Sequence, residues 1–264
     1  MSAHAMSPGG GMKHYGALAA RAIRNIIRQP TAIIPALLFP LMFQTMTAAA
    51  MGNSTRLRGF PAVDSFVQFS FATTIIQGAI FGSTAAGSAL AADIEGGFFE
   101  RLLSSPVRRT AIIVGQVSGA ALLGFFMTWF FYGVTAMFGL EAESGLQGVL
   151  AVSLVIALLA AGMGGVMCSF ALWTGSREAV EGSFPMFFVL IFMSSAFFPR
   201  NLMEGWFKSV TSINPISHLI EGVRAQIIGP FDAGAMTRAL AVAAAAFVLG
   251  VGLSLLALRK RLAG

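Results

Sequence analysis

Long runs without a charged residue constrain this chain more than any other feature of its sequence. They cover residues 29–55, 65–92, 110–140, 144–176, 182–199 and 239–258. A helix needs about 20 residues, each rising about 1.5 Å, to cross the roughly 30 Å hydrocarbon core of a bilayer. Every run except 182–199 reaches that length, and 182–199 has the size of a short or re-entrant helix. Charged residues make up only 11% of the chain, against about 25% in an ordinary soluble domain, so the runs indicate a membrane protein.

The runs predict helices rather than barrel strands. In lipid, every backbone N–H and C=O group must be paired within the protein, which leaves only helices and closed barrels. Barrel strands are about 10 residues long and alternate apolar and polar side chains, and these runs are longer and do not alternate. We therefore predict an all-α membrane protein with six transmembrane helices, at about 31–51, 66–91, 111–138, 146–173, 184–198 and 238–258.

A single transmembrane domain is expected to occupy residues 13–264. Residues 1–12 are small, polar and glycine-rich, which favours a disordered amino-terminal tail. Residues 13–29 place three arginines on one helical face opposite an apolar face, a pattern typical of a helix lying in the membrane interface. Residues 199–237 mix apolar and charged residues and break at Asn214-Pro215, which predicts outer, re-entrant helices before the last span.

The distribution of lysine and arginine predicts the orientation. Six spans put both termini on one side of the membrane. If that side is the cytoplasm, 11 lysines and arginines lie inside and six outside, in agreement with the positive-inside rule. We therefore expect both termini in the cytoplasm. The net charge of +6 is dispersed between the spans, so it indicates attraction to membrane lipid rather than to nucleic acid.

One charged stretch interrupts the apolar pattern between the second and third predicted spans. Residues 92–109, ADIEGGFFERLLSSPVRR, hold Asp93, Glu95, Glu100, Arg101, Arg108 and Arg109. On a helix that begins near Glu95, one face carries Phe98, Phe99, Leu102 and Leu103, and the other carries Glu100, Arg101 and Ser104. A short amphipathic helix on the membrane surface can dock a soluble partner. A solvated connector is the alternative for this stretch.

Two stretches resemble membrane subunits of type-2 ATP-binding-cassette exporters, the bacterial drug, lipid and polysaccharide export permeases such as the daunorubicin-resistance type. The first comprises Glu95, Gly97, Glu100, Arg101 and Leu102 with the following SSPVRR. It departs from the family pattern at Ile94, where a basic residue is common, and at Phe98, where threonine is common. The second runs from Phe197 to Arg224 and matches at Pro199, Trp206, Asn214, Pro215, Ser217, Glu221 and Arg224.

The resemblance implies a permease subunit of an ATP-driven exporter in a bacterial cytoplasmic membrane. It implies a cytoplasmic coupling helix whose residues contact an ATPase subunit: Glu95, Gly97, Phe98, Glu100, Arg101, Leu102 and Arg108. It also implies a second permease subunit, identical or related, and a substrate path along the second and fifth spans with Phe69, Gln77, Phe188 and Met193 as candidates. The outer motif would comprise Trp206, Asn214, Pro215, Glu221 and Arg224. Because the spans hold no charge, the expected cargo is amphiphilic: a drug, a lipid or a lipid-linked glycan.

The chain itself lacks a nucleotide-binding motif. A phosphate-binding loop needs glycine and lysine followed by serine or threonine, and the three lysines here follow Met12, Phe207 and Arg259. We therefore expect no enzyme activity and no cofactor in this chain, with ATP and Mg²⁺ bound by the partner subunit.

Two other functions are open alternatives. An ion-coupled secondary transporter ordinarily needs carboxylates or histidines inside its spans, and the predicted spans contain none. An intramembrane hydrolase would have to use Ser217 and His218, but adjacent residues seldom point at each other and no acid at helical spacing orients the imidazole. No metal site is expected either, because the three histidines are scattered along the chain.

Overall fold

The computed structural model describes residues 30–104 and 109–263, so the predicted tail at 1–12 and interfacial helix at 13–29 lie outside the described residues. Within the described part, every regular element is helical, which confirms the all-α class. The elements are α2 (Pro30–Met51), η1 (Gly52–Arg56), α3 (Phe66–Glu95), α4 (Phe98–Leu103), α5 (Arg109–Ala136), α6 (Gly145–Thr174), α7 (Arg177–Gly182), α8 (Phe184–Phe192), η2 (Arg200–Leu202), α9 (Gly205–Ile213), α10 (Pro215–Ile228) and α11 (Ala233–Ala263).

Five helical segments in the described residues are long and apolar enough to cross a membrane. They are Ile33–Arg56, Phe66–Glu95, Arg109–Ala136, Gly145–Thr174 and Ala233–Ala263. The predicted span at 184–198 differs, because α8 ends at Phe192 and turns follow it. The side chains of Asn214, which caps α10, and of Arg224 in α10 bond the backbone carbonyls that this early helix end leaves free, so a continuous helix is not required there.

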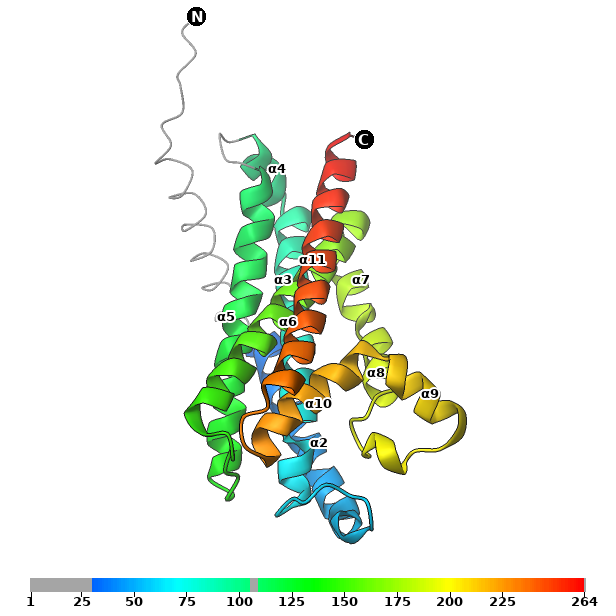
Figure 1. Cartoon of the computed structure of the whole chain (residues 1–264). Helices are drawn as coiled ribbons and strands as arrows, with labels where there is room; N and C mark the ends of the chain where they lie inside the picture. The colour runs from blue at the N-terminus through cyan, green and yellow to red at the C-terminus, as the bar shows by residue number, and fades with distance from the viewer. Residues whose placement is uncertain (1–29, 105–108, 264) are drawn as a thin grey trace, which may run out of the picture.

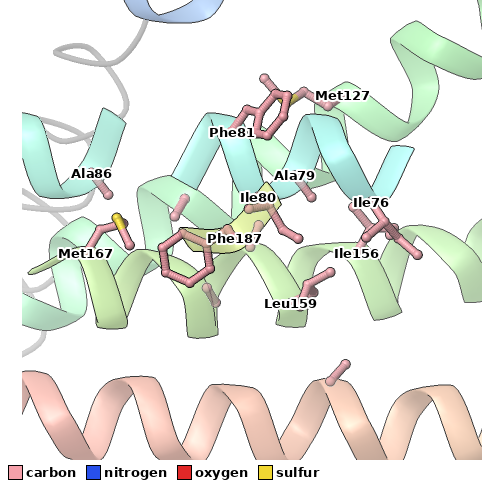
Figure 2. Close-up of a cluster of buried hydrophobic side chains, with 14 of the residues drawn as sticks. Ile76, Ala79, Ile80, Phe81, Ala86, Met127, Ile156, Leu159, Met167 and Phe187 are labelled. Carbon is pink, nitrogen blue, oxygen red and sulfur yellow. The ribbon is translucent and has the colours of Figure 1, made fainter. Parts of the chain in front are cut away.

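Helix α3 lies at the centre of the bundle. The apolar window that would cross the membrane is 89% buried in α3, against 22% in α11. Figure 2 shows Ile76 and Ile80 of α3 facing Ile156 and Leu159 of α6, and these side chains belong to one buried apolar cluster. The core is therefore built on α3 and α6.

Small residues allow the long helices to approach closely. A Cβ atom at Gly82 of α3 would lie 2.8 Å from Cε of Met127 on α5, so that methionine fills the space above the glycine. A Cβ at Gly165 of α6 would lie 2.6 Å from the carbonyl carbon of Gly250 on α11. Backbone-to-backbone packing of this kind is typical of helices in membranes.

The two ends of the bundle hold different short elements (Figure 1). One end, which we call the α4 end, contains α4 and the carboxyl end of α11. The opposite end contains η1 and the connection between α5 and α6, while α9 and α10 extend sideways from the lower half of the bundle. The charged stretch and the outer motif predicted from the sequence thus occupy different regions of the molecule.

Candidate functional site

A glycine turn separates α4 from α3. Helix α3 continues to Glu95, and Gly97 has φ +67°, in the left-handed region that favours glycine. The helix expected to begin near Glu95 therefore begins at Phe98 instead, and that prediction was wrong. The reason is local, since two consecutive glycines favour a turn over a continuous helix.

Helix α4 has the predicted division between an apolar and a charged face. Phe99 is 1% exposed, and Leu102 and Leu103 are half-buried. Glu100, Arg101 and Ser104 are exposed. The guanidinium of Arg101 lies 5.7 Å from the centre of the half-buried Phe98 ring. We give the name α4 surface to the exposed Glu100, Arg101 and Ser104 together with Phe98, which belongs to the apolar face but is only half-buried; Arg108, predicted to act with them, lies outside the described residues.

Glu95 bonds within the chain. Its carboxylate accepts a hydrogen bond of 2.8 Å from the backbone N–H of Arg177, the first residue of α7. A carboxylate at a helix amino terminus satisfies a free N–H group and complements the helix dipole. The Arg177 side chain in turn pairs with Glu181 at 2.8 Å, one turn along α7. Glu95 therefore links the end of α3 to the start of α7.

Arg261 of α11 contacts α4 and was not among the predicted site residues. Its guanidinium lies 5.7 Å from the centre of the Phe99 ring and 3.9 Å from the Glu100 carboxylate. It also donates a hydrogen bond of 2.9 Å to the Leu172 carbonyl, near the end of α6. The sequence offered only the basic triplet at 259–261, which indicates orientation in the membrane but not a contact.

Residues of the outer motif bond the backbone at the end of α8 and in the turns that follow it. Asn214 caps α10, because its side-chain oxygen accepts from the Ile216 N–H at 2.9 Å and Pro215 occupies the first turn. The same amide donates to the carbonyls of Leu190 and Met193 at 2.7 and 2.8 Å. These carbonyls lie where α8 ends, so Asn214 joins the end of α8 to the start of α10.

Arg224 bonds both α3 and the turns that follow α8. It is 6% exposed, and its guanidinium lies 3.6 Å from the centre of the Phe69 ring. Its N–H groups donate to the carbonyls of Phe69, Ser195 and Ala196 at 3.0 to 3.2 Å. Burial lowers the pKa of Arg224 to about 9, while the nearby Glu221 carboxylate opposes that shift. Glu221 itself pairs with Arg200 at the edge of this cluster.

The predicted path residues do not form one group. Phe69 is fully buried beneath Arg224, and Gln77 is 1% exposed within α3, where its side-chain nitrogen has no hydrogen-bond partner. Phe188 is half-buried and stacks on Phe81 at 5.2 Å, and Met193 is half-buried at the end of α8. Trp206 of the outer motif is 66% exposed on α9 and is not a partner in the bonds of Asn214 and Arg224 described above.

The known proteins that this chain resembles are described as transporters or transport permeases. Residues 13–228 match the family described as ABC-2 type transporter. The chain is 25% identical to the daunorubicin resistance ABC transporter permease protein DrrB1 of Streptomyces coeruleorubidus, over 75% of this chain and 69% of the relative. It is 26% identical to the putative transport permease ycf38 of Porphyra purpurea, over 79% and 72% of the two chains. It is 24% identical to the probable doxorubicin resistance permease DrrC of Mycobacterium tuberculosis, over 79% and 75%. Because the family match covers most of its length, the chain belongs to the ABC-2 type transporter family.

Proposed function

We propose that this chain is the permease subunit of an ATP-driven exporter that moves an amphiphilic drug, lipid or lipid-linked glycan out of a bacterial cell. The observation that carries the proposal is the position of α4 (Figure 1) and the exposure of its charged residues. It is a short helix at one end of an apolar bundle, with Phe99 buried and its charged residues exposed. Membership of the ABC-2 family and the drug-resistance names of two relatives support drug-like cargo.

In this proposal the α4 surface docks an ATPase subunit in the cytoplasm, where ATP and Mg²⁺ bind. Exposed charges of both signs, Glu100 and Arg101, favour a specific polar contact over insertion into lipid. Movement of α4 reaches α3 across the turn at 96–97, and α3 in turn is linked to α7 through the Glu95 bond to Arg177. The bundle then changes between inward-open and outward-open packing.

A sixth crossing is part of the proposal. Helices α7 and α8 follow each other along one side of the bundle, starting near the α4 end (Figure 1). With the turns after Phe192 they make a broken span, whose free backbone groups are bonded by Asn214, the residue that caps α10, and by Arg224 within α10, rather than exposed to lipid. Six crossings would leave both termini on one side of the membrane, and the lysine and arginine distribution supports the cytoplasm as that side, with α9 and α10 at the outer leaflet.

The path was expected along the second and fifth spans, α3 and α8, but the apolar window of α3 is 89% buried. We therefore propose the path along α8 and the neighbouring α2, where a second permease subunit, identical or related, would face this one. Of the four predicted path residues, Phe188 and Met193 are partly exposed and fit this surface better than the buried Phe69 and Gln77. Met42 and Met46 are exposed on α2, the helix whose Phe39 and Phe43 contact Phe188 and Phe192 of α8. Methionine adapts to differently shaped apolar ligands.

A charge reversal on the α4 surface tests the docking role. Arg101→Glu is compared with Arg58→Glu, which reverses an exposed arginine at the opposite end of the bundle. Each variant is co-expressed with a cassette ATPase that assembles with the wild-type permease, and complex yield and ATP-dependent efflux of a fluorescent anthracycline are measured. Arg101→Glu should reduce complex yield about tenfold, as expected for the loss of one close charge pair at an interface, while Arg58→Glu leaves it unchanged. Equal yield and efflux for both variants would refute docking through α4.

A further inference from the structure

Arg261 occupies a junction between three helices at the α4 end. Its guanidinium is near the Phe99 ring and the Glu100 carboxylate of α4, and bonds the Leu172 carbonyl of α6. Its own backbone belongs to α11. The side chain is 28% exposed, so it is partly enclosed by these neighbours.

The contact with α6 has a clear physical basis. Helix α6 ends at Gly175, which has φ +67°, and Leu172 belongs to the last turn, whose carbonyls lack a partner within the helix. A cation there bonds a free carbonyl and complements the negative end of the helix dipole. A Cβ at Gly175 would lie 3.4 Å from Nη1 of Arg261, so the guanidinium rests on the glycine that ends α6.

The two preceding residues show that this placement is specific. Arg259 and Lys260 are exposed, whereas Arg261 is half-buried. Arg261 follows Leu258 by three residues and Ala257 by four, and both of these are buried, so it lies on the inward face of α11. All three cations can attract anionic lipid, but among the described residues Arg261 alone of the three contacts both α4 and α6.

We infer that Arg261 is the positioning residue that fixes α4 against the ends of α6 and α11, so that a force on α4 moves these two helices together with α3. The inference rests on the proposed function. The covalent link from α4 to α3 runs through Gly96 and Gly97, which resist bending poorly. The planar guanidinium supplies a second attachment, since it can stack on Phe99, pair with Glu100 and bond Leu172 at once.

The test compares Arg261→Gln with Arg259→Gln in the complete complex reconstituted with its ATPase in lipid vesicles. ATP hydrolysis and anthracycline transport are measured on the same samples. In Arg261→Gln, transport per ATP hydrolysed should fall about fivefold or more, the usual lower range of coupling between sites, while ATP hydrolysis persists. Arg259→Gln should behave as wild type, and Arg261→Lys should fall between them because it keeps the cation without the planar fork.

Hydrogen exchange provides a second readout that a general loss of stability would not mimic. In the wild-type complex, trapping the ATPase with vanadate should change exchange in α4 and in residues 254–263 together. In Arg261→Gln the change should remain in α4 and disappear from 254–263. If Arg261→Gln does not assemble, Arg261→Lys is used for the same comparison.

The outcomes separate the inference from the proposed function. If the wild-type complex hydrolyses no ATP or transports nothing, the proposed function fails. If the wild type transports and Arg261→Gln equals Arg259→Gln in both readouts, the proposed function stands and the role of Arg261 is refuted.

Discussion

Replacing Arg224 with methionine tests whether one buried cation holds the broken segment after α8. The guanidinium bonds the carbonyls of Phe69, Ser195 and Ala196. Ala196 keeps a second donor, the Thr73 hydroxyl at 3.1 Å, and the Phe69 carbonyl lies in the hydrogen-bond ladder of α3. Of the three carbonyls, that of Ser195 therefore loses most, because Arg224 is its donor and no second donor replaces it among the described bonds.

The size of the effect follows from these contacts. A hydrogen bond to a charged group contributes about 1.5–3 kcal/mol to the free energy of unfolding, and this net value already includes the hydration that the groups lose on folding. The cation–π contact with Phe69 adds about 1–2 kcal/mol at a buried site. Counting only the Ser195 bond in full, we expect Arg224→Met to lower the free energy of unfolding by about 3–4 kcal/mol.

The matched control is Arg200→Met, which breaks the partly exposed pair with Glu221 and should cost under about 1 kcal/mol. Both variants are unfolded by SDS in mixed micelles and followed by tryptophan fluorescence. Arg224→Met should unfold at a clearly lower SDS fraction than Arg200→Met. If the two variants unfold together, the carbonyl bonds do not stabilise this segment and the reasoning fails.

Two further predictions concern packing and orientation. Gly82→Leu should lower the free energy of unfolding by about 1–3 kcal/mol, the usual range for overpacking, because the new side chain meets Met127. Gly133→Leu has open space beside it and should leave the free energy of unfolding unchanged. Equal unfolding of the two variants would contradict the packing of α3 on α5. A cysteine at the exposed Ser104, in a chain with Cys168→Ala, should react with a membrane-impermeant maleimide only in inside-out vesicles; labelling from outside intact cells would overturn the proposed orientation.

The sequence was sufficient for the helical class and for the faces of α4. Both depend on local patterns: long charge-free runs, and apolar residues at helical spacing in 98–103. The beginning of α4 was misplaced because periodicity alone does not locate a break, although Gly96-Gly97 was a visible turn signal.

The end of α8 depends on a different kind of information. The stretch 184–198 is apolar enough to continue as a helix, and nothing in its own composition demands turns after Phe192. The turns form where Asn214, Ser217 and Arg224, which lie 20 or more residues further along, bond the freed backbone groups. A motif in one segment thus decides the conformation of another, and local propensity cannot reveal this.

The same limit explains why Arg261 was missed, and the surroundings of Arg261 are similar in kind to those of the buried Arg224. Arg224 and Arg261 each bond carbonyls of another helix end or turn, and each lies against a phenylalanine ring. Arginine suits this position because it offers five N–H donors in a planar group that stays protonated. Helical spacing assigns each arginine to an inward face, but the bonded carbonyl of Leu172 is 89 residues from Arg261. In a bundle with so few charges, an arginine on the buried face of a helix therefore predicts a nearby helix break, while the identity of that break requires the fold.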